Sequence, residues 1–171
     1  MIRALLLLLA LSLTSCGFHL RGHNVRGSDL PFSSLHLKYA NTTPFITELQ
    51  ANLELYKVRM EPTATLADLT LEIVSEGNEK RILSLSGSGQ IREFELRYRV
   101  SLRAYDKQMR DWLTSDEILL QRTLTYDDTQ ILAKEQEEAL INRDMRSDAV
   151  QQVMRRLSRA KPRPESISTQ K

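Results

Sequence analysis

Residues 94–105 alternate strictly between apolar and polar side chains over twelve positions, and this pattern limits the possible folds more than any other feature. Such alternation is typical of a β-strand that is buried on one face only. The apolar face comprises Phe94, Leu96, Tyr98, Val100, Leu102 and Ala104, and the polar face comprises Glu93, Glu95, Arg97, Arg99, Ser101 and Arg103. We expect a long strand whose outer face is a solvated ladder of charges.

A second apolar run follows a polar turn around Lys107–Asp111 and extends from Trp112 to Tyr126. Three of its apolar residues share one phase, so the run is the expected antiparallel partner of the first strand: Ile118, Leu120 and Leu124. Arg122 interrupts that phase, which indicates either a β-bulge or an inward-facing charge.

Two amphipathic helices are expected. Thr43 and Pro44 suit the N-cap and first position of a short helix that ends near Leu55. Residues 129–159 contain neither glycine nor proline, follow two aspartates suited to capping, and predict a helix about 45 Å long. Its apolar residues recur at helical spacing: Ile141, Met145, Ala149, Val150, Val153, Met154 and Leu157.

Shorter strands are expected at residues 35–39, 58–60 and 69–73, the last broken by Glu76-Gly77-Asn78 before residues 82–85 resume. Gly87-Ser88-Gly89 predicts a turn or bulge, since no Gly-Lys-Ser/Thr follows to complete a phosphate-binding loop. The predicted fold class is α+β. Two helices pack on one face of a roughly four-stranded, mostly antiparallel sheet with one long hairpin.

The N-terminus predicts an exported lipoprotein. Arg3 precedes an apolar run, Ala4–Leu13, that is about half the ~20 residues needed to span a bilayer. Leu13-Thr14-Ser15-Cys16 matches a bacterial lipobox, in which the cysteine carries a diacylglycerol and an acyl chain. The alternative is an ordinary secretory signal with a chance cysteine, although Cys16 is the only cysteine and has no disulfide partner within the chain. Gly17, in place of aspartate, favours sorting to the outer membrane.

Length and charge fit one domain. We expect a signal peptide at 1–15, a single lipoprotein domain at 16–160 and a disordered tail at 161–171. Removing residues 1–15 from the 171 leaves 156, and of the 24 basic side chains only Arg3 is lost, so 23 remain against 22 acidic ones. This balance argues against a nucleic-acid-binding protein, which needs a concentrated basic surface.

No motif indicates catalysis or metal binding. The chain lacks Gly-x-Ser-x-Gly and His-Glu-x-x-His, and lipidation would consume its one thiol. His19, His23 and His36 show no regular ligand spacing. We therefore expect neither an enzyme nor a metal protein, and no cofactor besides the lipid on Cys16.

An ordered set of short motifs over nearly the whole mature chain resembles the LptE (formerly RlpB) family of lipopolysaccharide-assembly lipoproteins, whose fold agrees with the one predicted above. The motifs are Cys16–Arg21 after the lipobox, Arg122-x-x-x-Tyr126-Asp127, Leu132–Glu135, Arg143–Met145 and Arg155–Leu157.

The resemblance implies a non-catalytic, periplasm-facing lipoprotein of the outer membrane. It would plug the β-barrel LptD, assist the assembly of that barrel and bind lipopolysaccharide. The family's lysine in Leu-Ala-Lys falls on Lys134. A family arginine before Asn-Gly-Gln has no counterpart at Gly87–Gln90, and Arg92, two residues beyond Gln90, is the candidate replacement.

Further cations on the polar strand face, Arg97, Arg99 and Arg103, are candidates to contact either lipopolysaccharide phosphates or acidic groups of the barrel wall. Two other functions stay open at this point. The chain could act as a free lipoprotein adaptor in the periplasm without a barrel partner. It could also carry a polar lipid in an internal cavity, although its low aromatic content argues against this.

Overall fold

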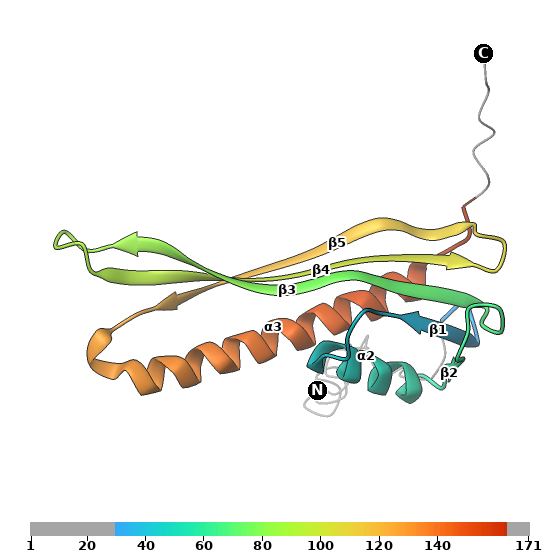
Figure 1. The fold of residues 1–171 in the computed structure, drawn as a ribbon, viewed down its shortest axis with the longest axis horizontal. Coiled ribbons are helices and arrows are strands. Elements are labelled where there is room, and N and C mark those ends of the chain that lie inside the picture. Colours follow the sequence, from blue (N-terminus) through green and yellow to red (C-terminus); the bar gives the residue numbers. More distant parts are fainter. Residues whose placement is uncertain (1–29, 164–171) are drawn as a thin grey trace, which may run out of the picture.

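The computed structural model describes residues 30–163, which form two helices on one face of a five-stranded sheet (Figure 1). The elements are β1 (Ser34–Lys38), α2 (Pro44–Leu55), β2 (Arg59–Met60), β3 (Leu69–Leu85), β4 (Ile91–Asp106), β5 (Asp111–Thr125), a short 3₁₀ turn η2 (Asp128–Gln130) and α3 (Ile131–Arg159). The predicted signal peptide, Cys16, residues 17–29 and most of the predicted tail, residues 164–171, lie outside the described residues.

The predicted α+β class is confirmed, with three differences in detail. The sheet has five strands in the order β2-β1-β3-β4-β5, and it is mixed because β1 runs parallel to both β2 and β3. There are two long antiparallel pairings rather than one, since β3 pairs with β4 and β4 pairs with β5. These three strands form an elongated meander with α3 running beneath it (Figure 1).

The expected break of β3 at Glu76–Asn78 is wrong. The strand is continuous for 17 residues, and the irregularity is a bulge at Val74, where the register with β4 shifts between Ile73 and Ser75. The bulge shifts the alternation of β3 by one residue, so that Ile73 before it and Glu76 after it both pair with inward-facing residues of β4. Gly77 is accommodated in the strand because pairing with Arg99 of β4 outweighs its weak local preference for strand.

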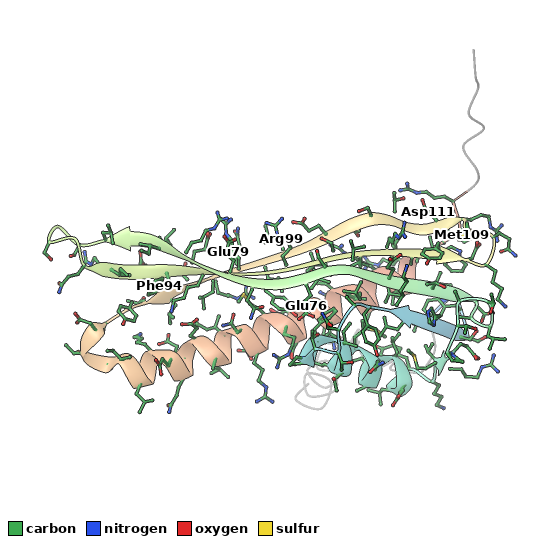
Figure 2. All side chains as sticks on the ribbon, viewed as in Figure 1. Glu76, Glu79, Phe94, Arg99, Met109 and Asp111 are labelled. Atoms are coloured by element: carbon green, nitrogen blue, oxygen red, sulfur yellow. The ribbon has the colours of Figure 1, made fainter. Side chains whose placement is uncertain are left out.

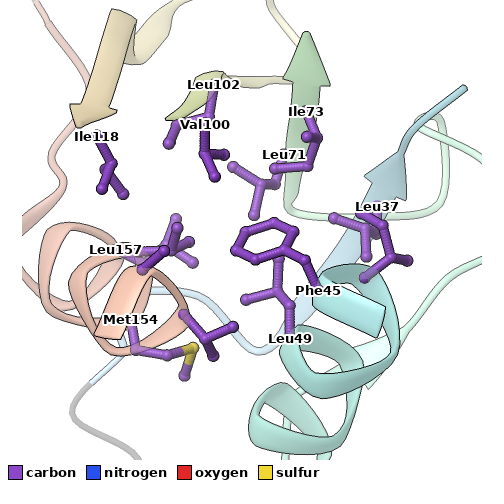
Figure 3. Packing of buried hydrophobic residues seen from close by; sticks show 14 of the residues in the cluster. Leu37, Phe45, Leu49, Leu71, Ile73, Val100, Leu102, Ile118, Met154 and Leu157 are labelled. Atoms are coloured by element: carbon purple, nitrogen blue, oxygen red, sulfur yellow. The ribbon is translucent and has the colours of Figure 1, made fainter. Parts of the chain in front are cut away.

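The core lies between the helices and the inner sheet face, and the predicted alternation accounts for it. Leu96, Tyr98, Val100, Leu102 and Ala104 of β4 are all buried, as are the expected positions in the second half of α3. Figure 3 shows how these layers meet: residues of α2 and α3 pack against Leu71, Ile73, Val100, Leu102 and Ile118 of the sheet.

Helix α2 begins as predicted. Thr43 is its N-cap, with the hydroxyl accepting a hydrogen bond from the Ile46 N–H at 3.3 Å, and Pro44 follows. The Thr43 hydroxyl also donates to Glu76 of β3 at 2.5 Å, and the buried Tyr98 hydroxyl donates to the same carboxylate at 2.5 Å. Burial and the Glu76 charge raise the Tyr98 pKa well above its usual range. This polar cluster fixes α2 against β3 and β4.

Candidate functional site

The tip of the β3–β4 hairpin is a tight turn formed by Ser86–Gln90, as the Gly-Ser-Gly sequence predicts. The Ser86 N–H donates to the Gln90 carbonyl at 2.7 Å, and the Gly89 N–H donates to the Ser86 carbonyl at 3.0 Å. Gly89 has a φ of 81°, in the left-handed region that favours glycine. The turn is therefore encoded locally.

A cleft of about 810 Å³ lies between this tip and the segment that joins β5 to α3. Asp127 closes that segment by accepting hydrogen bonds from the N–H and hydroxyl of Thr129. Most of the residues that line the cleft are polar, and they carry both signs of charge: Ser84, Ser86, Gly89, Gln90, Ile91, Arg92, Glu93, Thr125, Tyr126, Asp127 and Asp128.

Arg92 occupies a bulge in this cleft. Ser84 pairs with Glu93 and Leu85 pairs with Ile91, so Arg92 is the extra residue of β4. Bulges re-aim side chains and are frequent beside functional sites. Arg92 is exposed, and it has no ion-pair partner within residues 30–163. Its guanidinium is therefore available to an anion.

Lys134 lies near the same end, in the first turns of α3. Its Nζ is 2.8 Å from Oε2 of Glu137, and its side chain is only 18% exposed. The pKa of Asp127 lies below its usual range, mainly through the hydrogen bonds from Thr129, with a further contribution from the charge of Lys134. Because Asp127 also lines the cleft, Arg92 and Lys134 belong to one region of the molecule.

The other predicted cations lie on the opposite face of the sheet. Figure 2 shows Arg99 and Glu79 projecting away from the helices. Arg97 pairs with Glu95 at 2.6 Å, Arg99 with Glu117 at 3.2 Å, and Arg103 with Glu72 at 2.6 Å. The expected ladder of charges is confirmed, and each of these arginines is already paired. The structure thus separates the predicted cations into two sets, one at the hairpin tip and one on the outer sheet face.

Inward-facing charges link β5 to α3. Arg122 lies opposite Leu96 with no register shift nearby, so the bulge alternative is wrong and the inward-charge alternative is confirmed. Its Nη2 contacts Asp148 of α3 at 2.9 Å. Asp116, on the same face of β5, lies 2.6 Å from Nη1 of Arg156. These two contacts align the helix along the strand.

Lys80 is a further charged residue near this end, and it was not predicted from the sequence. Its Nζ lies 2.5 Å from Oε2 of Glu138 in α3 and 4.2 Å from the centre of the Phe94 ring. Phe94 in turn packs edge-on against Tyr126, with ring centres 5.2 Å apart. Lys80 thus ties β3 to α3 near the cleft. Lys80 lies two residues before Ile82, so on a continuous strand the two side chains point to the same face of the sheet. This spacing was the signal that could have revealed the direction of the Lys80 side chain.

Within residues 30–163 there is no helix long and apolar enough to cross a membrane. The same residues contain no group of three or more carboxylate and histidine side chains placed to hold a metal ion. The lining of the hairpin-tip cleft offers charge and hydrogen-bond recognition through Arg92, the carboxylates Glu93, Asp127 and Asp128, and neighbouring hydroxyl and amide groups.

Solved structures of bacterial lipoproteins share this fold. An uncharacterized lipoprotein B from Nitrosomonas europaea is 37% identical, with a TM-score of 0.70 over 83% of this chain and 90% of that one. The rare lipoprotein B from Shewanella oneidensis is 23% identical, with a TM-score of 0.64 over 71% and 91%. A minor lipoprotein from Acinetobacter baumannii is 21% identical, with a TM-score of 0.63 over 79% and 98%. Among curated proteins, none matches the chain.

A family model described as LptE, lipopolysaccharide-assembly, matches residues 32–157, which span the whole core from the residues before β1 to the last turns of α3. Together with the Nitrosomonas europaea structure, this match bears out the resemblance seen in the short motifs. The chain belongs to the LptE family of lipopolysaccharide-assembly lipoproteins.

Proposed function

We propose that this protein is a non-catalytic lipoprotein of the outer membrane that occupies the lumen of an LptD-type β-barrel, assists its assembly and binds lipopolysaccharide at the hairpin tip. The lipid on Cys16 would hold it at the periplasmic side of that membrane. The observation that carries the proposal is the elongated two-layer body of an LptE-family chain, with paired charges along one face and an available arginine at one end.

The outer sheet face suits a polar lumen. Barrels of this kind have polar interiors, so a plug needs a hydrophilic surface that keeps its shape. The outer face meets this need with ion pairs within strands, Arg81 with Glu79 and Arg97 with Glu95, and between strands, such as Arg99 with Glu117. Exposed pairs contribute little to folding free energy, so their main effect is to make the face polar and patterned.

The hairpin-tip cleft suits a phosphorylated lipid. Lipopolysaccharide carries phosphates at lipid A and the inner core, and guanidinium and ammonium groups bind phosphate with charge-assisted hydrogen bonds. Arg92 needs no rearrangement to do so. To bind the ligand, Lys134 would have to leave Glu137. The Glu137 side chain is 47% exposed, so water can solvate its carboxylate when Lys134 leaves.

The test compares Arg92→Asp and Lys134→Asp with Arg143→Asp, a control at an exposed arginine in the middle of α3. Each charged hydrogen bond contributes about 1.5–3 kcal/mol, so each site variant should weaken binding of purified lipopolysaccharide about tenfold or more. The thermal midpoint should stay unchanged in Arg92→Asp, because Arg92 is exposed, and should fall in Lys134→Asp, which loses the pair with Glu137 at a mostly covered position; circular dichroism shows whether that variant is folded. Unchanged affinity in both site variants, or an equal loss in the control, would refute the assignment.

A further inference from the structure

The end of the molecule opposite the hairpin tip carries two adjoining clefts that share Trp112. It is formed by the start of β5, the last turns of α3 and the first described residues, and we call it the Trp112 end. One cleft is cationic and the other largely apolar. Neither takes part in the function proposed above.

The cationic cleft has a volume of about 530 Å³. Gln152, Arg155, Arg156 and Arg159 line it from one stripe of α3, at helical spacing, with Lys161 just beyond the helix and Trp112 opposite. Arg156 is neutralised by Asp116. No ion pair joins Arg155, Arg159 or Lys161 to any residue between 30 and 163.

The helix dipole favours cations in the last turn of α3, which accounts for Arg156 and Arg159. It does not account for Arg155 or Lys161, or for the gathering of like charges around one indole. Asp106, the buried carboxylate beside Trp112, is neutralised by Arg110 and so does not offset them. An anion in this cleft would relieve their mutual repulsion.

The apolar cleft has a volume of about 810 Å³ and continues from the other side of Trp112. Leu30, Phe32, Tyr56 and Val58 supply most of its apolar lining, and Lys57 and Asp68 add one charge of each sign. The Phe32 and Trp112 rings meet edge to face, with centres 6.5 Å apart. An amphipathic tryptophan ring beside cations is typical of protein surfaces that lie at the headgroup level of a membrane.

The chain's own tether points to the same end. Leu30 is 14 residues after Cys16, a separation that an extended chain spans in at most about 50 Å. The hairpin tip lies a full length of β3 away, about 55 Å. A lipid anchor on Cys16 therefore limits how far the Trp112 end can lie from the bilayer, whereas it allows the tip to lie about 55 Å farther away.

We propose that the Trp112 end binds an anionic phospholipid surface, with lipid phosphates in the cationic cleft and Trp112 at the headgroup level. The inference rests on lipid attachment at Cys16, which is part of the proposed function, but not on the barrel or on lipopolysaccharide. It would orient the hairpin tip away from the leaflet that holds the anchor.

Trp112 is the only tryptophan of the chain, so its fluorescence reports this end alone. The lipidated protein is reconstituted in vesicles of brominated phosphatidylglycerol, or of brominated phosphatidylcholine as the neutral case, and quenching by the bromine atoms is measured. Quenching is expected in the anionic vesicles and should fall in the neutral ones. In the double variant Arg155→Gln/Arg159→Gln, quenching in anionic vesicles should drop to the value measured in neutral vesicles. The matched control Arg81→Gln/Arg143→Gln should be quenched as strongly as the lipidated protein without substitutions. Far-ultraviolet circular dichroism checks that each variant is folded.

Equal quenching in neutral and anionic vesicles, or undiminished quenching in the cleft variant, would overturn the inference. A protein that floats with vesicles while Trp112 stays unquenched would overturn it and leave the anchor intact. If that protein also loses a co-purifying barrel in the cleft variant, the cations contact protein instead. If the protein does not float, it has no lipid anchor, and this inference fails together with that part of the proposed function. Flotation therefore distinguishes a failure of the anchor from a failure of the inference alone.

Discussion

Asp106→Asn should destabilise the fold at the β4–β5 turn. The Asp106 carboxylate is nearly buried and accepts hydrogen bonds from the Gln108 N–H at 3.0 Å, the Arg110 N–H at 2.9 Å and Nε at 2.8 Å, and Trp112 Nε1 at 3.2 Å. These contacts close a turn in which Met109 adopts a positive φ of 61°. An asparagine can satisfy only the donors that meet its single carbonyl oxygen.

The magnitude follows from the contacts that are lost. Arg110 Nε and Trp112 Nε1 both donate to Oδ2, and an NH₂ group there would face two donors. Hydrogen bonds to charged groups contribute about 1.5–3 kcal/mol each, and the Arg110 share is reduced by its 44% exposure. We expect a loss of about 2–3 kcal/mol in the free energy of unfolding at pH 7.

The effect should depend on pH. Burial raises the pKa of Asp106, but hydrogen bonds from Arg110 and Trp112 outweigh burial, so its folded pKa lies below the ordinary 3.8. A carboxylate with a depressed pKa stabilises the fold above its unfolded pKa and loses that contribution as pH falls through its folded pKa. The difference between the two proteins should therefore be largest at neutral pH and shrink below about pH 4. Asp68 and Glu72, whose pKa values are also lowered, are present in both proteins and cancel.

Urea unfolding followed by Trp112 fluorescence and circular dichroism measures this difference at several pH values. Asp148→Asn is the control, because the Arg122–Asp148 pair is about half exposed on both sides and should contribute under about 1 kcal/mol. A loss below about 0.5 kcal/mol for Asp106→Asn at pH 7, or one that does not change with pH, would refute the reasoning.

Three further changes test other parts of the account. Val100→Asp buries an unpaired charge at a fully buried position and should abolish cooperative unfolding, whereas a folded, soluble variant would contradict the placement of the core. Thr43→Ala removes the N-cap of α2 and its link to Glu76, so denaturant unfolding should show a loss of about 1–2 kcal/mol that Thr43→Ser largely restores; an equal loss in both would assign the effect to the methyl group. Cys16→Ala should displace the protein from the outer-membrane fraction in a density gradient, and unchanged fractionation would argue against the lipid anchor.

The spacing of apolar residues in the sequence correctly predicted the strand and the helix whose apolar faces pack in the core. The alternation of residues 94–105 and the helical stripe of residues 141–157 each describe one inward face, and both faces are buried as expected except at their first residues, Phe94 and Ile141, which are partly buried. The cap of α2 was equally readable, because Thr43 and Pro44 act within one turn. Topology was less accessible. The sequence of β1 does not record that it pairs in parallel with two neighbours distant along the chain.

Turn-forming residues led to a wrong prediction where pairing with a neighbouring strand determines the structure. Glu76-Gly77-Asn78 has the composition of a turn, yet β4 supplies a continuous ladder opposite it. Treating the strand as broken also concealed that Lys80 faces α3. Conversely, Arg122 stood out as an exception to the alternation, and its partner Asp148 explains why a charge is tolerated on that face.

The candidate site could be predicted only in part. On residue type and family resemblance alone, four cations were candidates for one site: Arg92, Lys134, Arg97 and Arg99. In the structure, Arg92 and Lys134 lie at the hairpin-tip end, whereas Arg97 and Arg99 lie on the outer face of the sheet. The availability of Arg92 depends on a bulge, and the pairing of Arg99 with Glu117 depends on the register of β4 with β5. Such features arise from the tertiary structure and leave no local signal in the sequence.

The most direct test of the account is a mild-detergent pull-down of the tagged protein from outer membranes, with mass spectrometry and quantification of what accompanies it. We predict a large β-barrel of the LptD type in a one-to-one ratio, which a protein that folds inside a lumen requires. Recovery of the lipoprotein alone, at normal abundance and in the outer-membrane fraction, would contradict the account and favour a free periplasmic adaptor.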